Sequence, residues 1–418
     1  MSKPMTLAQQ LVREMTVDRL GHRGDGMAED VFIPNTVPGD RVRVAIYGDR
    51  GRVLERLEDG PHRRAPACRH FAECGGCAVQ HVEDSLYRSW KLEQLTRALA
   101  HRGFADVAVE PLISIPPGTR RRVSLRARIG GTERIMGFQE RASHRLVDVE
   151  ECPITRPEIV AALPSLRSLV AAGLANGGTA QVQVTHTESG LDVVVSPEPE
   201  RPLEGWQLEP LANEAIAMGL ARLTWNGDLV VERAPPYVIM SGTGVAIPPG
   251  AFLQPSAEGE AALARLVAEA VGGIGKTADL FAGCGTFTFA LARSVPVHAV
   301  EGDGAQLAVI DATARTEREF KPITMERRDL TRRPLIASEL KPFKAVVLDP
   351  PRAGARTQVA EIAKSSVERV VLVSCNPATF ARDLRMLVDA GYTLGRITPV
   401  DQFVWSPELE VVGVLTRG

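Results

Sequence analysis

The stretch TADLFAGCGTFTFALARSVPVHAVE, residues 277–301, is the clearest indication of the fold of the C-terminal half of the chain. It reads as an apolar strand, a loop with Gly283 and Gly285, a helix that begins at Thr286, and a second apolar strand. This order predicts a parallel β–α–β unit, whose ligand lies beyond the carboxyl end of the first strand. The two glycines allow the backbone to approach that ligand closely.

The residues at the strand ends indicate which ligand the loop holds. Asp279 ends the first strand and Glu301 closes the second, where a carboxylate accepts hydrogen bonds from ribose hydroxyls. A phosphate-binding G-x-G-x-x-G loop requires a third glycine, but Phe287 and Thr288 follow Gly285 here. The sequence therefore predicts a nucleoside without phosphates, and S-adenosylmethionine is the commonest such ligand on this fold.

Strands and helices continue to alternate from about residue 251 to the C-terminus. Apolar runs such as KAVVLDPP and RVVLVSCNP alternate with helices that we expect over 304–319, 356–366 and 378–390. The alternation indicates a Rossmann-like, doubly wound parallel sheet.

The N-terminal part has a different pattern. Short β-rich runs between Gly and Pro turns over 12–58 predict a small, OB-like five-stranded β-barrel, a type that often binds oligonucleotides. An amphipathic helix is expected over 82–103, docked on the C-terminal α/β domain, and 115–250 consists mostly of predicted strands in antiparallel hairpins. We therefore expect a multidomain α/β protein with a barrel domain over 1–60, a central, mostly antiparallel β domain over 61–250, and the α/β domain over 251–418.

Composition excludes several classes of protein. The 418 residues are 44% hydrophobic and 24% charged, which is ordinary for a globular protein and excludes wholesale disorder. No apolar run approaches the roughly 18 residues of a transmembrane helix. The N-terminal MSKPMTLAQQLVREM has no apolar signal-peptide core, so we expect a cytoplasmic monomer without a membrane partner.

The basic charge is unevenly distributed. The net charge of −2 excludes a uniformly basic surface, yet Arg120–Arg145 contains eight Arg and two Glu. Only seven of the 49 basic residues are Lys, and Arg suits bidentate phosphate contacts better than Lys does. The pattern predicts a local nucleic-acid-binding patch, although a GC-rich genome also favours Arg codons.

Four of the six cysteines form one constellation. Cys68, Cys74 and Cys77 have the spacing C-x5-C-x2-C, and Cys152 is followed by proline. Clustered cysteines in a reducing compartment indicate metal binding rather than disulfides. Four cysteines with one before proline are typical of iron–sulfur ligation, whereas a zinc site more often has two C-x2-C pairs. The spacing favours iron–sulfur and leaves zinc open.

Two further motifs follow strands of the α/β domain. VLDPPR ends one strand and places Asp349 and Arg352 on a loop that prolines stiffen; alone, D-P-P also suits an N-methyltransferase that acts on adenine. The next strand ends at Cys375, and Asn376 opens a helix whose N-terminus is expected to lower the pKa of the thiol. A nucleophilic cysteine in the ligand crevice disfavours the N-methyltransferase interpretation.

Together these motifs resemble the S-adenosylmethionine-dependent RNA uracil-5-methyltransferases over nearly the whole chain. The resemblance is greatest to the bacterial 23S ribosomal-RNA branch, which carries a TRAM barrel and a [4Fe-4S] cluster. The segments that carry it are GDGMAEDVFIPNTVPGD, CRHFAECGGCAVQH with ECPI, TRRRVSLRARI, AFLQPSAEGE, DLFAGCGTFTFALA, VLDPPRAG and SCNPATFARDL.

The resemblance implies a role for individual residues. The barrel would be a TRAM domain, the four cysteines Cys68, Cys74, Cys77 and Cys152 would hold the [4Fe-4S] cluster, and Cys375 would be the nucleophile. Glu410 matches the general base. The resemblance assigns contacts with S-adenosylmethionine to Gln254, Phe281, Thr286, Glu301, Asp329 and Asp349.

Three positions depart from the pattern of the family. Thr286 and Ser256 each stand where relatives usually have Asn. Glu408 stands where relatives have a His two residues before the base, so a second carboxylate lies close to Glu410 in the sequence. The details of cofactor binding and the identity of the base therefore depend on the structure.

The implied reaction is methyl transfer to C5 of a uridine in RNA, with 23S rRNA as the expected substrate. Addition of the Cys375 thiolate to C6 makes C5 nucleophilic, and Glu410 then removes the C5 proton. The base must leave its stack to react. Transfer RNA is the alternative substrate. A non-enzymatic iron–sulfur RNA-binding protein is a second alternative, which leaves Cys375 and Glu410 unexplained.

Overall fold

The computed structural model describes residues 11–418, which contain two compact units. The first unit comprises residues 11–94, Gln139–Arg145 and Phe403–Pro407; the second comprises Leu95–Phe138, Leu146–Gln402 and Glu408–Gly418. None of the helices within residues 11–418 has both the length and the apolar character needed to cross a membrane. The expectation about a signal peptide concerns mainly residues 1–10, which lie outside the described part of the chain.

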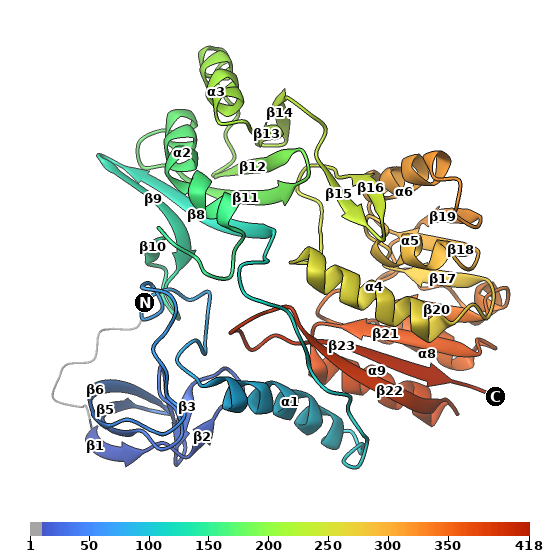
Figure 1. Cartoon of the computed structure of the whole chain (residues 1–418), viewed down its shortest axis with the longest axis horizontal. Coiled ribbons are helices and arrows are strands. Elements are labelled where there is room, and N and C mark those ends of the chain that lie inside the picture. Colours follow the sequence, from blue (N-terminus) through green and yellow to red (C-terminus); the bar gives the residue numbers. More distant parts are fainter. Residues whose placement is uncertain (1–10) are drawn as a thin grey trace. The chain divides into compact units, whose positions relative to one another are not determined.

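The N-terminal strands form a sheet of their own in the first unit (Figure 1). Alternation of residue types explains its core, because Val42 and Val44 of β5 are buried while Arg41 and Arg43 between them are exposed. Six strands are present where the sequence predicted five, in the order β1-β5-β6-β4-β3-β2. The strands are β1 (Leu11–Thr16), β2 (Arg19–Leu20), β3 (Gly26–Ala28), β4 (Val31–Ile33), β5 (Arg41–Tyr47) and β6 (Arg50–Glu58).

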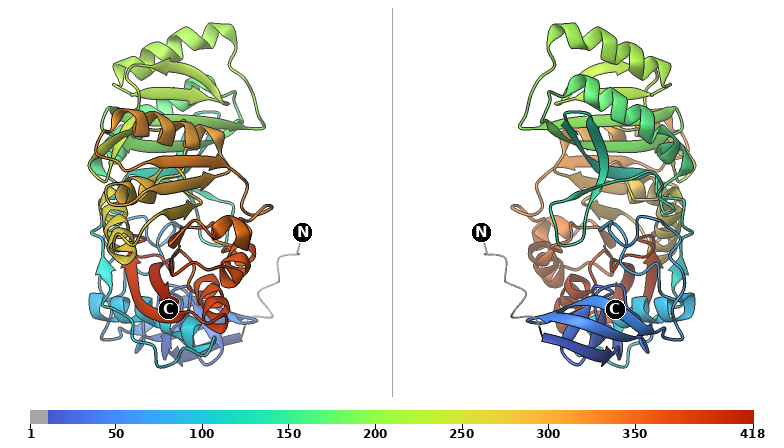
Figure 2. Two further views of the ribbon diagram at one scale, coloured as in Figure 1. Left: turned by 90° about the vertical axis from the view of Figure 1, so that its right-hand side faces the viewer. Right: turned by 90° about the vertical axis from the view of Figure 1, so that its left-hand side faces the viewer.

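A seven-stranded sheet is the first of two large sheets in the second unit, in the order β10-β9-β8-β11-β12-β13-β14. The predicted hairpins β8–β9 and β11–β12 are confirmed, although β12 and β13 are parallel. Two helices that were not expected, α2 (Pro157–Gly173) and α3 (Gly205–Ala217), cover one face of this sheet (Figure 2). The strands are β8 (Arg122–Gly130), β9 (Glu133–Gln139), β10 (Leu146–Asp148), β11 (Thr179–Thr187), β12 (Gly190–Glu198), β13 (Arg222–Trp225) and β14 (Asp228–Glu232).

An eight-stranded sheet is the second, in the order β19-β18-β17-β20-β21-β23-β22-β7. Its first five strands are parallel and β23 is antiparallel to both of its neighbours, which confirms the doubly wound arrangement. A hairpin of β15 (Tyr237–Met240) and β16 (Thr243–Ala246) precedes β17 in the chain. The strands are β7 (Ile113–Ser114), β17 (Thr277–Leu280), β18 (Val297–Glu301), β19 (Ile323–Arg327), β20 (Ala345–Leu348), β21 (Arg369–Ser374), β22 (Thr393–Asp401) and β23 (Glu410–Thr416).

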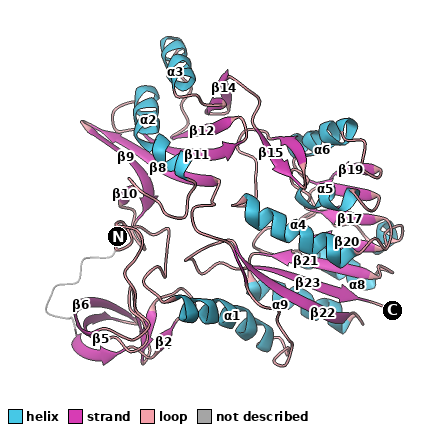
Figure 3. Cartoon of the chain, in the orientation of Figure 1, coloured by secondary structure: helices cyan, strands magenta, loops and turns pink. Residues whose placement is uncertain are grey.

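Helices cover both faces of the eight-stranded sheet (Figure 3). Val347 and Val371 on one face pack with Leu263 of α4, a helix that was not expected, while Leu348 and Leu372 on the other face pack with residues of α8 and α9. The predicted helices are confirmed within a few residues. The helices are α1 (Asp84–Ala100), α4 (Ala257–Val271), α5 (Thr286–Ala292), α6 (Gly304–Thr316), α7 (Ala337–Leu340), α8 (Arg356–Lys364) and α9 (Pro377–Asp389).

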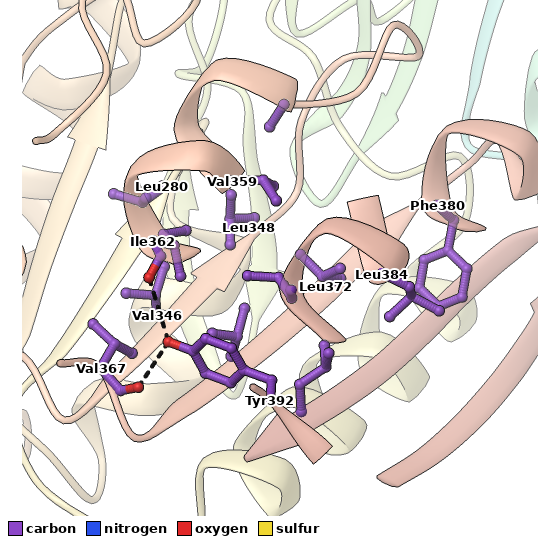
Figure 4. Packing of buried hydrophobic residues seen from close by; sticks show 14 of the residues in the cluster. Leu280, Val346, Leu348, Val359, Ile362, Val367, Leu372, Phe380, Leu384 and Tyr392 are labelled. Atoms are coloured by element: carbon purple, nitrogen blue, oxygen red, sulfur yellow. Dashed lines mark hydrogen bonds between the residues drawn. The ribbon is translucent and has the colours of Figure 1, made fainter. Parts of the chain in front are cut away.

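The core beneath α8 and α9 fixes the positions of the strands that carry the site (Figure 4). Tyr392 is buried there, and its hydroxyl donates a hydrogen bond of 2.8 Å to the carbonyl of Val367, so this buried polar atom has a partner. Leu95 and Leu99, at the end of α1, belong to the same core. Burial of each Leu or Val side chain stabilises the fold by about 1.5–3 kcal/mol relative to leaving it exposed, so these strands are held rigidly.

Candidate active site

The candidate site residues lie at the end of the eight-stranded sheet where its parallel strands terminate. This end is called the edge of the sheet. The carboxyl ends of the parallel strands β17, β18, β20 and β21 meet there, and ligands of open α/β sheets bind at this edge. Because β23 is antiparallel to β21, its first residue, Glu410, also lies at this edge, as does the end of β22. The topology therefore brings residues from six different segments to one place.

The glycine loop has the conformation that a close-fitting ligand requires. Gly283 and Gly285 have φ values of 58° and 100°, and a Cβ atom at Gly285 would lie 2.5 Å from the ring of Phe289. Phe281 also has a positive φ, 64°, and its N–H donates to the carbonyl of Val300 on the neighbouring strand. The loop is thus held tightly between β17 and α5.

Glu301 is fixed by backbone groups at the end of β18. Its Oε2 accepts a hydrogen bond of 3.0 Å from the N–H of Gly283, and its Oε1 accepts from the N–H groups of Gly302 and Asp303 at 2.6 and 2.9 Å. A carboxylate has four lone-pair sites, so acceptor capacity remains for ribose hydroxyls. Asp329 lies in the adjacent loop, where its Oδ1 accepts from the N–H of Thr331. This donor and acceptor set fits a nucleoside.

Asp279 and Thr288 form a pair beneath the glycine loop. The hydroxyl of Thr288 donates a 2.6 Å hydrogen bond to Oδ2 of the fully buried Asp279, and burial raises the pKa of Asp279 to about 7. The other oxygen of Asp279 has no hydrogen-bond partner within the described chain. The nearby Cys284 is buried as well, which raises the pKa of its thiol to about 12 and makes it an inert core residue.

Thr286, predicted to contact the cofactor, also belongs to a buried ionic cluster. Its hydroxyl bonds to Glu260 of α4, and Glu260 in turn accepts a 2.6 Å hydrogen bond from Arg121, the residue before β8. The Nε of Arg121 donates to the main-chain oxygen of Gln254 at 3.2 Å. Ser256, where relatives have Asn, accepts a hydrogen bond from the N–H of Gly259 and caps α4. Thr286 and Ser256, two of the three departures from the family pattern, therefore each have a hydrogen-bond partner.

A buried chain of side chains crosses the site. The amide Nε2 of Gln254 donates to Oδ2 of Asp349 at 3.1 Å, and Nε2 of Gln402 donates to Oε1 of Gln254 at 2.8 Å and to Oε2 of Glu410 at 2.9 Å. Gln402 was not a sequence-predicted site residue. Its only sequence signal is its position at the end of a strand, eight residues before Glu410.

Cys375 follows β21 directly and is half-buried at the same edge. The ladder pairs Ser374 with Val411, so one further step along the register places Cys375 opposite Glu410. The thiol pKa that we expected from the helix N-terminus is wrong in direction. Burial, followed by the charges of Glu410 and Asp349, raises the pKa of the Cys375 thiol to about 11.

The two neighbouring glutamates occupy different environments. Glu410 is 2% exposed, and burial raises its pKa to about 7, while the hydrogen bond from Gln402 has the opposite effect. Glu408 lies nearer the surface and forms an ion pair of 2.8 Å with Arg352 of the D-P-P-R loop. A base that titrates near neutral pH is the better proton acceptor, so Glu410 fits that role better than Glu408.

The four cysteines of the predicted cluster belong to different units. Cys68, Cys74 and Cys77 lie in the first unit, where the N–H of Gly76 donates to Sγ of Cys74 at 3.4 Å. Cys152 lies in the second, where it accepts from the hydroxyl of Thr155 at 3.2 Å. Three or more Cys, His, Asp or Glu side chains grouped so that they could hold a metal are not found in residues 11–418.

The Arg-rich stretch has both buried and exposed members. Arg121 is 3% exposed and engaged with Glu260, so it is unavailable to a phosphate group. Arg126 and Arg128 alternate with buried residues along β8 and point to the face of the sheet opposite α2 and α3. In the row across this face, Arg126 lies opposite Gln181, and Gln181 lies opposite Ser196. The exposed face is therefore polar.

Comparisons with known proteins show which family this chain resembles. The family described as tRNA (Uracil-5-)-methyltransferase matches residues 246–417. An RNA methyltransferase of Brucella melitensis is 45% identical over 97% of this chain and 98% of its own length. The 23S rRNA (uracil(1939)-C(5))-methyltransferase of Chromohalobacter salexigens is 31% identical over 96% and 89%.

A solved structure shares the fold. The tRNA (uracil-54, C5)-methyltransferase of Pyrococcus abyssi, in complex with S-adenosyl-L-homocysteine, covers 97% of this chain and 100% of its own, with 22% identity and a TM-score of 0.75. The mixed α/β architecture, with a β-rich N-terminal region and a methyltransferase domain, is thus that of a known enzyme fold. Sequence identity over nearly its full length places this chain in the family of S-adenosylmethionine-dependent RNA uracil-5-methyltransferases.

Proposed function

We propose that this protein transfers a methyl group from S-adenosylmethionine to C5 of a specific uridine in 23S rRNA, through a covalent bond between Cys375 and C6. The observation that carries the proposal is the position of Cys375 and Glu410 at the edge of the sheet that also holds the glycine loop and Glu301. A nucleophile, a base of suitable pKa and a nucleoside-binding loop thus meet in one region.

The cofactor would be held by six residues at that edge. Glu301 is oriented by three backbone donors and would accept hydrogen bonds from the ribose, with Asp329 beside it. The carboxyl groups of Asp349 and Glu410 favour a cationic ligand, and bound S-adenosylmethionine supplies an electrophilic methyl group on a positively charged sulfur. The contacting residues in this proposal are Gln254, Phe281, Thr286, Glu301, Asp329 and Asp349.

Cys375 and Glu410 would act in succession on the uracil. The Cys375 thiol releases its proton to solvent, and its sulfur forms a bond to C6 while the π electrons of C5–C6 move toward the C4 carbonyl. C5 would then form a bond to the methyl carbon of S-adenosylmethionine while the bond from that carbon to sulfur breaks, so that S-adenosylhomocysteine is the leaving group. Glu410 removes the proton from C5, the double bond re-forms, and the bond between sulfur and C6 breaks. Because an uncharged thiol is a poor nucleophile, loss of the Cys375 proton is an essential part of the addition.

RNA would be held by two polar surfaces. The exposed face with Arg126 and Arg128 offers phosphate contacts in the central region, 61–250. The N-terminal sheet, within 1–60, would act as a TRAM domain, and 251–418 would carry out the chemistry. A 23S rRNA substrate is supported by the name of the 31% identical relative and by the presence of the N-terminal sheet and the cysteine motif.

Cys68, Cys74, Cys77 and Cys152 would ligate a [4Fe-4S] cluster that braces the fold. The donor set suits it, because four thiols are available and a backbone N–H and a hydroxyl already donate to two of the sulfurs. No step of the reaction depends on the cluster. Protein purified without oxygen should contain about four iron atoms per chain. Zinc in place of iron would contradict this assignment.

The substrate is tested by mass spectrometry of 5-methyluridine. Ribosomal and transfer RNA from cells with and without the gene are digested, and the purified protein is then given each RNA with labelled S-adenosylmethionine. We expect one uridine of 23S rRNA to lose its methyl group in the deletion strain and to regain it in vitro. Loss confined to transfer RNA would favour the alternative substrate, and the absence of any methyl transfer would refute the enzyme assignment.

A further inference from the structure

Gln402 occupies the centre of the buried chain that links the two ends of the site. It is the residue after β22, is 4% exposed, and uses both hydrogens of its amide nitrogen. One hydrogen bond goes to Glu410 and the other to Gln254, which itself donates to Asp349. Along both hydrogen-bonded paths the amide groups donate away from Gln402. One path ends at the carboxyl group of Glu410 and the other at that of Asp349.

The surroundings of Gln402 fix the orientation of its amide. The oxygen Oε1 is buried and accepts no hydrogen bond from any described residue, which is costly and rare in a folded protein. A Cβ atom on Gly259 would lie 2.5 Å from this oxygen, so the absence of a side chain at Gly259 makes room for the amide. Leaving Oε1 without a partner is tolerated because the reversed orientation would present an oxygen to Glu410 and break two hydrogen bonds.

We propose that Gln402 is a positioning residue that holds Oε2 of Glu410 as a hydrogen-bond acceptor, so that the other carboxylate oxygen is the one presented to the C5 proton. This inference rests on the proposed function, because it assigns a means of orienting the proposed base. A donor to the charged form of a carboxylate also favours that form, which is the form a base requires. Gln402 thus keeps Glu410 both oriented and ready to accept a proton.

The charged groups around Glu410 work against its ionisation. Asp349 after β20 and Glu408 before β23 face the same region as Glu410 and oppose a further negative charge there, while Arg352 pairs with Glu408. The thiol of Cys375, after β21, also faces this region, but its raised pKa leaves it uncharged near neutral pH. Asp279 of β17 lies near Asp349 and adds a further carboxyl group. Among the side-chain hydrogen bonds described for Glu410, the one from Gln402 is the donor that offsets this repulsion.

The test replaces Gln402 by residues of similar length. Gln402→Met removes the donor, and Gln402→Glu replaces it by a carboxyl group beside Oε2 of Glu410. The same change at Gln358, a buried glutamine that bonds to the backbone N–H and carbonyl of Leu335, gives the matched control, Gln358→Met. For each variant, decay of the covalent protein–RNA adduct and methyl transfer are measured from about pH 5 to pH 9.

We expect decay of the adduct at neutral pH to slow at least tenfold in Gln402→Met, because a hydrogen bond to a charged group contributes about 1.5–3 kcal/mol. On the acid side of the pH–rate profile (the low-pH limb), the pH at which the rate falls should increase in the order wild type, Gln402→Met, Gln402→Glu. Gln358→Met should keep the wild-type limb even if its thermal stability falls. If Gln402→Met is unstable, Gln402→Glu, which keeps the shape of the side chain, carries the comparison.

Two outcomes would contradict the proposed role of Gln402. A folded Gln402→Glu or Gln402→Met enzyme with the wild-type limb and normal decay of the adduct would overturn the proposal. An equal displacement of the limb in Gln358→Met would assign the effect to packing and overturn it as well. If wild-type protein methylates no uridine at all, the proposed function fails, and that failure is visible before any variant is compared.

Discussion

The two large sheets of the second unit present their polar residues in different ways. In the eight-stranded sheet, Asp349, Cys375 and Glu410 lie where strands begin or end, and both faces are covered by helices. In the seven-stranded sheet, polar residues such as Arg126 and Gln181 lie along an exposed face, and only the opposite face is covered. The difference follows from the covering: a sheet buried on both faces leaves only its edge for function.

An edge and a face suit different tasks. Strand ends bring a few side chains to one point, which favours bond making and proton transfer. An alternating strand spreads side chains about two residues apart over a surface, which suits contacts with a repeating backbone. Loss of one residue should therefore cost much more at the edge than on the face, and four experiments test this expectation.

The largest effect is expected at the nucleophile and the base. Cys375→Ala should lower methylation by at least about 10⁴-fold and abolish the covalent adduct, because no thiolate is available for C6. Glu410→Gln should allow addition and methyl transfer but stall removal of the C5 proton, so the adduct should accumulate on denaturing gels. Glu408→Gln is the matched control and should turn over. An adduct trapped by Glu408→Gln instead would transfer the base role to Glu408.

A stability effect is expected next, at the ion pair between Arg121, the residue before β8, and Glu260 of α4. Arg121 and Glu260 are both buried at a distance of 2.6 Å, so Arg121→Met should cost about 3–5 kcal/mol by leaving a buried carboxylate without its partner. On the face, Arg126 and Glu198 are also 2.6 Å apart but exposed, and Glu198→Gln should cost less than about 1 kcal/mol. Denaturant unfolding of both variants measures the contrast. Equal losses would show that the distinction between edge and face does not extend to stability.

The pH dependence of the reaction tests the environment of the edge. Burial raises the pKa of Glu410 to about 7, and only its ionised form accepts a proton, so activity should be lost as the pH falls below 7. At one pH unit below its pKa, about a tenth of a carboxyl group is ionised. Asp279 titrates in the same range, so Asp279→Asn is the control, and its limb should remain near pH 7. A wild-type limb near pH 4.5 would mean that the base is exposed in the RNA complex.

The smallest effect is expected on the face of the seven-stranded sheet. Arg126→Ala with Arg128→Ala should weaken RNA binding by about tenfold and flatten its salt dependence, because each lost phosphate contact removes about 0.7–0.9 from the slope of log K against log salt. Binding of S-adenosylmethionine should not change. Ser124→Ala on the same face removes no charge and is the control. An unaltered salt slope in the double variant would exclude this face from the RNA interface.

Much of the fold is visible in local patterns. The period of two in β8 and β11 and the strand–glycine–helix order around Gly283 depend on neighbouring residues, and both are confirmed. Helices α2 and α4 were missed although Ile159, Leu163 and Leu166 have helical spacing, because their apolar content resembles that of buried strands. The length of such a segment, more than ten residues without a turn, was the signal that could have separated the two.

The glycine loop, the acidic strand ends and the motif cysteine Cys375 could be identified from local sequence, because each is a short segment whose chemistry depends on its own residue types. The groups that surround them became known only from the folded chain. Gln402 bonds to Gln254, 148 residues away in the chain, and Arg121 reaches Glu260 across 139 residues. Such contacts, and the burial that raises the pKa of Cys375 instead of lowering it, arise only when strands distant in the chain align at one edge.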